Sequence, residues 1–394
     1  MDLLITPRLL TGAVTPPPSK SQAHRALLAL MLAGGEGRLS NLEFSQDIRA
    51  TEDCVAALKA PGHEGVLPLL DCGESGSTLR FLIPVALALR GGAQFTGRGR
   101  LMERPQQPYF DLFDRMGIVH EQEEGTLTIW GKLTPGEYAL PGNVSSQFVT
   151  GLLFALPLLE GDSTLRLTSD LESAGYVDMT LDVLQKFGVQ VERPSERIFH
   201  IPGNQSFQAR DLTIEADWSQ AAFWFAANAL GSSVRILGLD PASAQGDKVI
   251  RTHYAKLCKT GRVCLNLAQC PDLAPPLAAM AALRSGTTQF IRAGRLRIKE
   301  SDRLASITAT LNALGAHAEA GEDTLTIHGL DSLAGGASID CQNDHRIAMM
   351  AAVAAIRCRE PVVLLGADCV RKSYPKFWDH YRMLGGMADV VIPG

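Results

Sequence analysis

Six stretches of this chain are almost wholly apolar, and each one follows a short polar loop. They begin near six positions spread along the sequence: Ser21, Ser77, Ser146, Ser219, Leu273 and Asp344. Each runs for about three or four helical turns, the common length of helices in globular proteins. Because a helix that is apolar on every face must be buried on every face, the pattern predicts six core helices. None of the stretches reaches the roughly 18–20 apolar residues that a membrane-spanning helix needs.

The residues around these apolar stretches repeat as well. Behind each stretch a glycine turn leads into a short strand of alternating character, such as AQFTG (93–97). In several repeats an amphipathic helix ending at glycine follows, such as DMTLDVLQKFGV (178–189). The repeats recur at roughly 55–75 residues, so we expect six units that form two pseudo-threefold α/β domains. An open doubly wound sheet is less favoured, because the sequence shows neither a GxGxxG turn nor consecutive buried parallel strands.

The length and charge of the chain limit its class. At 394 residues it is too long for one ordinary core and suits two domains. A net charge of −5 argues against nucleic acid or an anionic membrane as the partner. The eight cysteines form no CxxC pair or zinc spacing, and the nine histidines include no HExxH pair. We therefore expect a cytoplasmic monomer with free thiols, no metal and no cofactor, and the first residues show no secretion signal.

The starts of the six apolar helices carry the polar residues. A helix start offers unpaired N–H groups and the positive end of the dipole, which favour anions. The first three starts bring cations, hydroxyls and an amide: Lys20, Ser21 and Arg25; Ser75, Ser77 and Arg80; Ser145, Ser146 and Gln147. The last three bring carboxylates, with a histidine and an arginine beside the third: Asp217, Asp272, Asp344, His345 and Arg346. If both sets face one cleft, the first half binds anions and the second half transfers protons.

Taken singly, most of these segments have a structural explanation. SKSQAHR (19–25), CGESGSTLR (72–80) and SSQ (145–147) can each be a capped helix start with solvated charges. The segment RIKESDR (297–303) is more specific, since on a helix Lys299 and Arg303 would share a face. Two like charges there favour a bridging anion, and Glu300 beside them could serve as a base.

The cations exceed what a single phosphate needs. They are Lys20, Arg25, Arg104, Lys299, Arg303, Arg346 and Lys372. In a chain of negative net charge, gathering them requires a polyanionic ligand or two ligands. No P-loop accompanies them, so the sequence indicates chemistry on phosphorylated small acids by positioning and acid–base catalysis.

At this point the chain resembles one family, the 5-enolpyruvylshikimate-3-phosphate synthases, also called 3-phosphoshikimate 1-carboxyvinyltransferases. The matching segments run in the family's order from residue 19 to residue 375: SKSQAHR, ESGSTLRFL, MERP, NVSSQF, SAGY, PDLAPPLA, RIKESDR, NDHRIAM and KSYP. The resemblance implies an inside-out, barrel-like α/β fold in which each domain has three βαβαββ-type repeats around buried helices. It places one domain at 1–18 plus 216–394 and the other at 19–215, with the active site in the cleft between them.

The resemblance also implies the reaction and the roles of residues. The carboxyvinyl group of phosphoenolpyruvate would move to the 5-hydroxyl of shikimate 3-phosphate, with release of phosphate through a tetrahedral intermediate. Asp272 would take the hydroxyl proton, Glu300 would handle the proton at the methylene carbon, and Lys20 would act as an acid toward phosphate. Shikimate 3-phosphate would be held by Ser21, Arg25, Ser145, Ser146, Gln147, Ser173, Tyr176, Asp272 and Lys299. Phosphoenolpyruvate would be held by Lys20, Gly76, Arg104, Gln147, Arg303, Arg346 and Lys372.

Two positions depart from the family's pattern, and other functions remain open. Glu74 stands where many members have asparagine, and Arg295 stands where some members have it. We expect no direct ligand role for Glu74. One alternative is the sister transferase acting on UDP-N-acetylglucosamine, which usually has a Lys-Asn pair where this chain has Lys20 and Ser21. A second is a non-catalytic phosphoacid-binding homologue, although binding alone gains nothing from carboxylates that face anions. RNA-end processing is a third, without support from charge or from an aromatic stripe.

Overall fold

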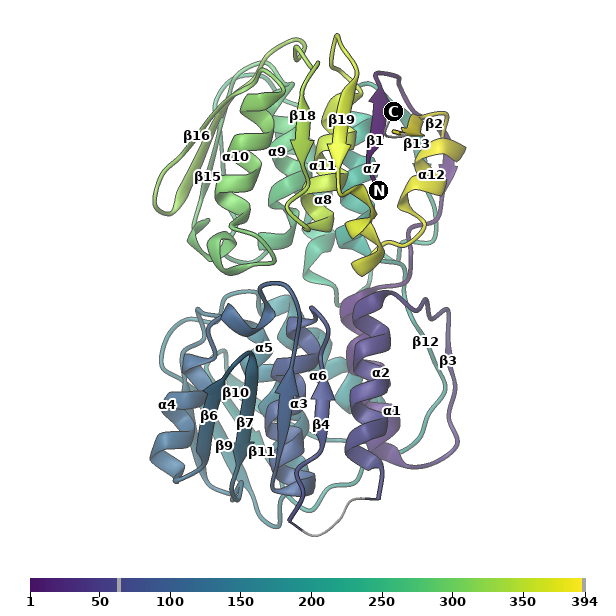
Figure 1. Cartoon of the computed structure of the whole chain (residues 1–394). Helices are drawn as coiled ribbons and strands as arrows, with labels where there is room; N and C mark the ends of the chain where they lie inside the picture. The colour runs from purple at the N-terminus through teal and green to yellow at the C-terminus, as the bar shows by residue number, and fades with distance from the viewer. Residues whose placement is uncertain (62–64, 392–394) are drawn as a thin grey trace. The chain divides into compact units, whose positions relative to one another are not determined.

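The computed structural model describes residues 1–61 and 65–391, and they form two compact units (Figure 1). The central unit is Lys20–Ile214. The terminal unit is built from both ends of the chain, Met1–Ser19 and Glu215–Gly394. Among the described residues, no helix is long and apolar enough to cross a membrane.

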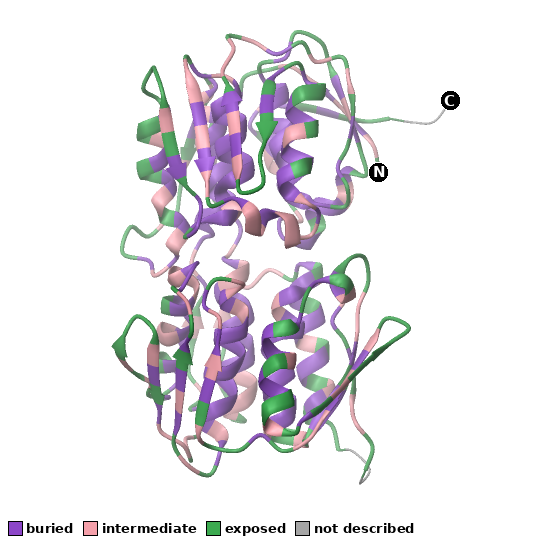
Figure 2. Cartoon of the chain, turned by 90° about the vertical axis from the view of Figure 1, so that its left-hand side faces the viewer, coloured by how far each residue is buried: buried purple, intermediate pink, exposed green. Residues whose placement is uncertain are grey.

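The six predicted core helices are confirmed, three in each unit. They are α1 (Lys20–Ala33), α3 (Gly76–Arg90), α5 (Ser146–Ala155), α7 (Trp218–Ala229), α9 (Ala274–Ala282) and α11 (His345–Ala355). Figure 2 shows how buried residues follow these helices through the interior of each unit. The expectation of burial on every face is wrong for the last turn of α1, where Leu30–Ala33 are only partly buried, and for the last turn of α3, where Leu89 is exposed. That helix packs on α2 (Gln46–Lys59) and α6 (Ala174–Lys186) and forms a small core of its own.

The sheets repeat one topology four times. In each four-stranded sheet a parallel pair is extended by two antiparallel strands, in the orders β4-β5-β7-β6, β8-β9-β11-β10, β14-β15-β17-β16 and β18-β19-β1-β20. The central-unit strands are β4 (Leu69–Asp71), β5 (Gly92–Thr96), β6 (Val119–Glu123), β7 (Thr126–Trp130), β8 (Glu137–Leu140), β9 (Ser163–Leu167), β10 (Glu192–Ser195) and β11 (Ile198–Ile201). The terminal-unit strands are β1 (Leu3–Thr6), β14 (Val263–Asn266), β15 (Thr287–Ile291), β16 (His317–Ala320), β17 (Thr324–His328), β18 (Ser338–Asp340), β19 (Val362–Leu365) and β20 (Met387–Val390).

The third repeat of each unit is shorter. It has only a parallel pair of strands: β3 (Leu39–Ser40) with β12 (Leu212–Thr213), and β2 (Thr11–Val14) with β13 (Ser233–Ile236). With these pairs, each unit has three repeats, two of them with a four-stranded sheet. Both of these repeats have the βαβαββ order in the central unit, whereas in the terminal unit the last repeat runs βαβαβ. The N-terminal strand β1 fills the last sheet of the terminal unit, which explains why the first residues belong to that unit.

The outer helices complete the repeats. The predicted amphipathic helices form as α4 (Gln107–Met116), α6, α10 (Arg303–Ala313) and α12 (Phe377–Met383). Two further outer helices, α2 and α8 (Ile250–Leu257), were not predicted.

The expectation that RIKESDR is helical is wrong. A 3-10 turn ends at Ile298, Lys299 is extended, and α10 begins only at Arg303. The reason is the aspartate at 302, which accepts a hydrogen bond from the backbone N–H of Ala305 and so caps the helix.

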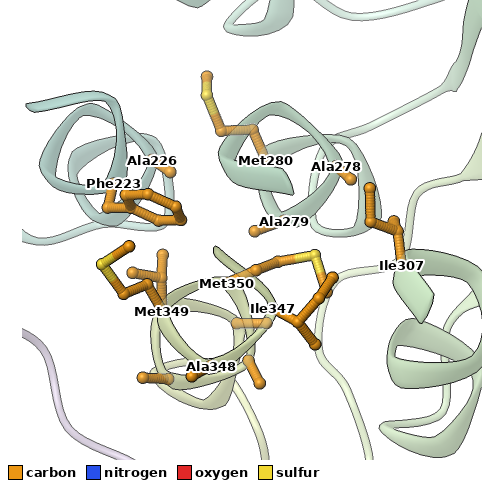
Figure 3. Close-up of a cluster of buried hydrophobic side chains, with 14 of the residues drawn as sticks. Phe223, Ala226, Ala278, Ala279, Met280, Ile307, Ile347, Ala348, Met349 and Met350 are labelled. Carbon is orange, nitrogen blue, oxygen red and sulfur yellow. The ribbon is translucent and has the colours of Figure 1, made fainter. Parts of the chain in front are cut away.

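The buried helices approach each other through small residues. In the terminal unit α7, α9 and α11 contact one another, and alanines lie between larger side chains such as Phe223, Met349 and Met350 (Figure 3). In the central unit α3 packs closely on α5. Gly151 permits this approach, because a Cβ there would collide with the carbonyl oxygen of Arg80 and the hydroxyl of Tyr109.

Candidate active site

In the central unit, Lys20 is the first residue of α1 and follows a run of prolines. Its Nζ lies 2.6 Å from Oδ2 of Asp47, in the first turn of α2, and both side chains are largely buried. Sequence reasoning missed Asp47. The available signal was Ser45, which caps α2 by accepting from the N–H of Ile48. A cation predicted to hold phosphate is therefore held in place by a carboxylate.

Arg25, one turn further along α1, is fully buried without an acidic partner. Its guanidinium donates to the hydroxyls of Thr180 and Thr150 at 2.8 and 3.3 Å. It also donates to the carbonyls of Ser21 and Tyr176 at 2.7 and 3.1 Å. No carboxylate in the described part of the chain neutralises it, and burial lowers its pKa to about 10. Such a charge is stabilised by an anionic ligand. The two threonines were not predicted from the sequence.

The start of α3 forms a second anion-binding feature. Ser75 caps the helix by accepting from the N–H of Thr78. The buried guanidinium of Arg104 lies against the next residue, Gly76, where a Cβ would stand 2.5 Å from its Nη1. The Nε of Arg104 is buried with no hydrogen-bond partner among residues 1–61 and 65–391. A helix start beside an unsatisfied guanidinium is suited to a phosphate or carboxylate.

Gln147 ties the starts of α3 and α5 together. Its amide oxygen accepts from Arg80 at 2.8 Å, and its amide nitrogen donates to the hydroxyl of Ser77 at 3.0 Å. Ser145 caps α5 by accepting from the N–H of Gln147, and Ser146 is buried beside it. The amide is thus oriented by charged and hydroxyl partners before any ligand binds.

The remaining central-unit candidates lie at the start of α6. Ser173 is buried and adopts a left-handed φ of 58°, which is uncommon for a residue other than glycine. Strain of this kind is concentrated at functional sites. The ring of Tyr176 lies 6.0 Å from the guanidinium carbon of Arg25, which connects this helix to α1.

In the terminal unit, Asp272 lies among three cations. Its Oδ1 is 3.2 Å from Nζ of Lys299 and 3.0 Å from Nη1 of Arg303, and its Oδ2 is 3.1 Å from Nη2 of Arg346. Burial alone would raise the pKa of Asp272, but Arg346, Lys299 and Arg303 together hold it well below the usual 3.8. The anion that bridges Lys299 and Arg303 is therefore a side chain of the protein itself.

Arg303, the first residue of α10, contacts three carboxylates. Besides Asp272, it lies 2.7 Å from Glu300 and 2.8 Å from Asp344. Burial would lower the pKa of this guanidinium, but the three carboxylates raise it well above its ordinary value. Asp344 also caps α11, since it accepts from the backbone N–H of Arg346 at 2.9 Å.

Lys372 completes this cluster from a neighbouring segment. It lies in a 3-10 turn (Ala367–Lys372), and its Nζ donates to the carbonyl of Asn343 at 2.6 Å, next to the start of α11. The structure therefore brings together five predicted residues of the terminal unit: Asp272, Lys299, Glu300, Arg303 and Arg346, with Lys372 beside them.

The two positions that depart from the family pattern have local roles. Arg295 donates to the carbonyl of Ala268 at 3.2 Å. The carboxylate of Glu74 lies against Gly99, where a Cβ would stand 2.7 Å from Oε2. Glu74 also lines a pocket of about 510 Å³ together with Arg98 and Asp71.

The fold and the two clusters define an α/β protein. In its central unit hydroxyls hold Arg25 and a carboxylate holds Lys20, and in its terminal unit carboxylates pair with Lys299, Arg303 and Arg346. The model of the EPSP synthase (3-phosphoshikimate 1-carboxyvinyltransferase) family matches residues 5–381. A 3-phosphoshikimate 1-carboxyvinyltransferase of Clostridium kluyveri is 46% identical, over 98% of this chain and 97% of the relative. One of Clostridioides difficile is 42% identical over 98% of both chains. The solved EPSP synthase of Acinetobacter baumannii has the same fold, with a TM-score of 0.78 and 23% identity over 99% of this chain and 100% of the other.

This chain belongs to the EPSP synthase family. The resemblance seen in the sequence motifs is thereby confirmed, and so is the two-domain α/β fold class.

Proposed function

We propose that this chain transfers the carboxyvinyl group of phosphoenolpyruvate to the 5-hydroxyl of shikimate 3-phosphate and releases phosphate. The family to which the chain belongs is named for this transfer. The observation that carries the proposal is the cluster in which Asp272 and Glu300 share Arg303. Two carboxylates among cations provide proton transfer beside a site for anions, which a binding protein does not need.

The proposed chemistry runs by addition and elimination. Once phosphoenolpyruvate has replaced Glu300 at Arg303, Glu300 in its protonated form gives a proton to the methylene carbon of phosphoenolpyruvate. Asp272 takes the proton of the 5-hydroxyl as the hydroxyl oxygen bonds to C2. In the elimination, the methyl group of the tetrahedral intermediate returns a proton to Glu300. The C–O bond to phosphate breaks, and Lys20 protonates the leaving group. The proton that Asp272 took from the 5-hydroxyl then returns to Lys20, which restores both residues for the next turnover. Cations stabilise the charge on both substrates throughout.

We assign the two substrates to the residues that the resemblance indicates. In the central unit, the buried charge of Arg25 and the strained Ser173 support binding of shikimate 3-phosphate there. The unsatisfied Nε of Arg104 supports binding of phosphoenolpyruvate beside Gly76. Because each substrate is assigned to residues of both units, the proposal places the complete active site in a cleft that closes between them.

We further propose that the protein works in the cytoplasm as a monomer. All eight cysteines are free, as in proteins of a reducing compartment. A single chain also carries every residue assigned to the two substrates, so the proposed site needs no second copy.

Phosphate release tests the proposal. We expect release only when phosphoenolpyruvate and shikimate 3-phosphate are both present, and at the same rate in EDTA, since no step uses a metal. Replacing shikimate 3-phosphate by UDP-N-acetylglucosamine should abolish release. Turnover with the UDP-sugar but not with shikimate 3-phosphate would overturn the proposal, and binding of both acids without turnover would favour the non-catalytic homologue.

A further inference from the structure

We propose that Asp344 is a positioning residue that fixes both arginines of the phosphoenolpyruvate site, Arg303 and Arg346. We also propose that phosphoenolpyruvate replaces Asp272 and Glu300, but not Asp344, as the partner of these cations. This inference rests on the proposed function and assigns a part to a residue outside the proposed substrate and catalytic set.

The contacts of Asp344 satisfy both of its oxygens. Oδ2 accepts from Nε of Arg303 at 2.8 Å and from the hydroxyl of Ser301 at 2.9 Å. Oδ1 accepts from Nη2 of Arg303 at 3.2 Å and from the backbone N–H of Arg346 at 2.9 Å. One carboxylate therefore binds Nε and Nη2 of Arg303. The same carboxylate accepts from the backbone N–H of Arg346 and so fixes the start of α11, which carries Arg346.

The three carboxylates on Arg303 differ in exposure. The side chain of Asp344 is 0% exposed, whereas those of Asp272 and Glu300 are 20% and 21% exposed. Separating a fully buried ion pair leaves an uncompensated charge and is strongly unfavourable, while partly exposed carboxylates regain hydration. A ligand that approaches Arg303 will therefore displace Asp272 and Glu300 and leave Asp344 in place.

The charge of the cluster favours such an exchange. Asp272, Glu300 and Asp344 carry three negative charges, against the positive charges of Lys299, Arg303 and Arg346 and of Lys372 beside them. A phosphorylated carboxylic acid gains little from cations whose charge is already largely offset unless carboxylates leave them. The exchange also frees Asp272 and Glu300, the two groups assigned to proton transfer, from the cations that keep Asp272 ionised.

The variant Asp344→Asn distinguishes a positioning role of Asp344 from an effect of its negative charge alone. Asparagine has the same shape and caps helices as well as aspartate does. If Asp344 acted only through its charge, removing a negative charge 2.8 Å from Arg303 would tighten binding of an anion. If it acts by positioning, the same change weakens binding of phosphoenolpyruvate, because the guanidinium of Arg303 loses the carboxylate that holds its Nε and Nη2.

The experiment compares Asp344→Asn with Asp302→Asn. Asp302 is the N-cap of α10 and immediately precedes Arg303, but its carboxylate bonds to the backbone N–H of Ala305 and to Arg297 at 3.1 Å, and to none of the guanidinium or ammonium groups of the cluster. For Asp344→Asn we expect the KM for phosphoenolpyruvate to rise at least tenfold. The Kd of shikimate 3-phosphate should stay within twofold of wild type. Asp302→Asn should leave both values unchanged.

A second variant covers the case in which Asp344→Asn does not fold. Ser301→Ala removes one hydrogen bond to Asp344 without touching Arg303, so it should raise the KM for phosphoenolpyruvate two- to fivefold. For both variants, an unchanged or lower KM for phosphoenolpyruvate would overturn the inference. An equal loss of affinity for both substrates would also overturn it, because a merely structural role acts on both.

The positioning role of Asp344 can be tested even if the proposed function is wrong. If the wild type shows no turnover, the same comparison is made by calorimetric titration with phosphoenolpyruvate. Weaker binding to Asp344→Asn than to Asp302→Asn would then support the positioning role, and equal binding would contradict it.

Discussion

At the start of α3, the position of the Arg104 guanidinium requires a glycine at residue 76. The guanidinium of Arg104 occupies the space that a side chain at 76 would need. The substitution Gly76→Ala should therefore move Arg104 rather than unfold the protein, because the colliding atoms are the far end of a flexible side chain. We expect the KM for phosphoenolpyruvate to rise about tenfold, equivalent to about 1.4 kcal/mol, with kcat nearly unchanged. Steady-state kinetics with either substrate varied measures this, and an equal rise in the KM for shikimate 3-phosphate would count against it.

His24 belongs to a buried chain of polar side chains beneath the starts of α1, α2 and α3. Its Nδ1 lies 2.7 Å from the hydroxyl of Thr51, which contacts Thr78, which in turn donates to Ser75, the cap of α3. Burial, with a smaller effect of Lys20 and Arg25, lowers the pKa of His24 well below 6.5. The imidazole is therefore neutral in the folded protein at neutral pH.

This lowered pKa gives a pH-dependent contribution to stability. Below pH 6.5 the unfolded chain takes up a proton at His24 that the folded chain does not, so stability falls by about 1.4 kcal/mol per pH unit. The variant His24→Gln lacks this contribution of His24 to the pH dependence of the free energy of unfolding. Denaturant unfolding should therefore show a free-energy difference between wild type and variant that is about 1.4 kcal/mol smaller at pH 5.5 than at pH 7.5. A difference that does not change with pH would contradict the assignment.

At the scale of helices, the crossing of α3 and α5 depends on Gly151. An added methyl group would meet the backbone of α3 at Arg80 and the hydroxyl of Tyr109, which bridges the carbonyls of Arg80 and Phe148. Because backbone cannot move aside as a flexible side chain can, Gly151→Ala should destabilise the central unit by about 1–3 kcal/mol. A loss of 2 kcal/mol corresponds to a fall in Tm of roughly 4–8 °C.

Calorimetry of Gly151→Ala and Gly151→Ser checks this prediction. The larger serine side chain should lower the Tm further than alanine does. A Tm equal to that of wild type for either variant would mean that α5 has room at this position.

Elements with a distinct composition could be predicted from the sequence, and elements that depend on packing could not. The core helices are recognisable because they are apolar on all faces, as α11 is with Met349 and Met350 buried. Helix α2 was missed because its sequence is rich in charge and it becomes a helix on the outside of α1. The segment around Lys299 was wrongly predicted as helical, since the spacing of charges is the same in a loop that ends at a capping aspartate.

In the candidate site, too, contacts that depend on packing could not be predicted from the sequence. The residue types at the helix starts were visible, and the division into hydroxyl-bearing and acidic halves agrees with the partners that Arg25 and Arg303 have in the structure. The pairing of Lys20 with Asp47 was not visible, because it arises from the packing of α1 on α2 across 27 positions of sequence. Thr150 and Thr180 were missed for the same reason.

For the whole molecule, the proposal requires the two units to close on shared substrates. Shikimate 3-phosphate is assigned to Arg25 of the central unit and to Asp272 and Lys299 of the terminal unit. We expect small-angle scattering to show a smaller radius of gyration when shikimate 3-phosphate is added. A variant lacking the charge of Arg25, Arg25→Gln, should show no compaction at the same concentration. An unchanged radius for the wild type at saturation would count against closure.

The central claim is that carboxylates of the terminal unit perform the proton transfers of carboxyvinyl transfer. Phosphate release by Glu300→Ala, with both substrates saturating, tests it most directly. General acid–base groups contribute about 10²–10⁴-fold, so we predict a fall in kcat of at least about a hundredfold. Binding of shikimate 3-phosphate should be retained. A variant that keeps phosphate release within a fewfold of wild type would contradict the account.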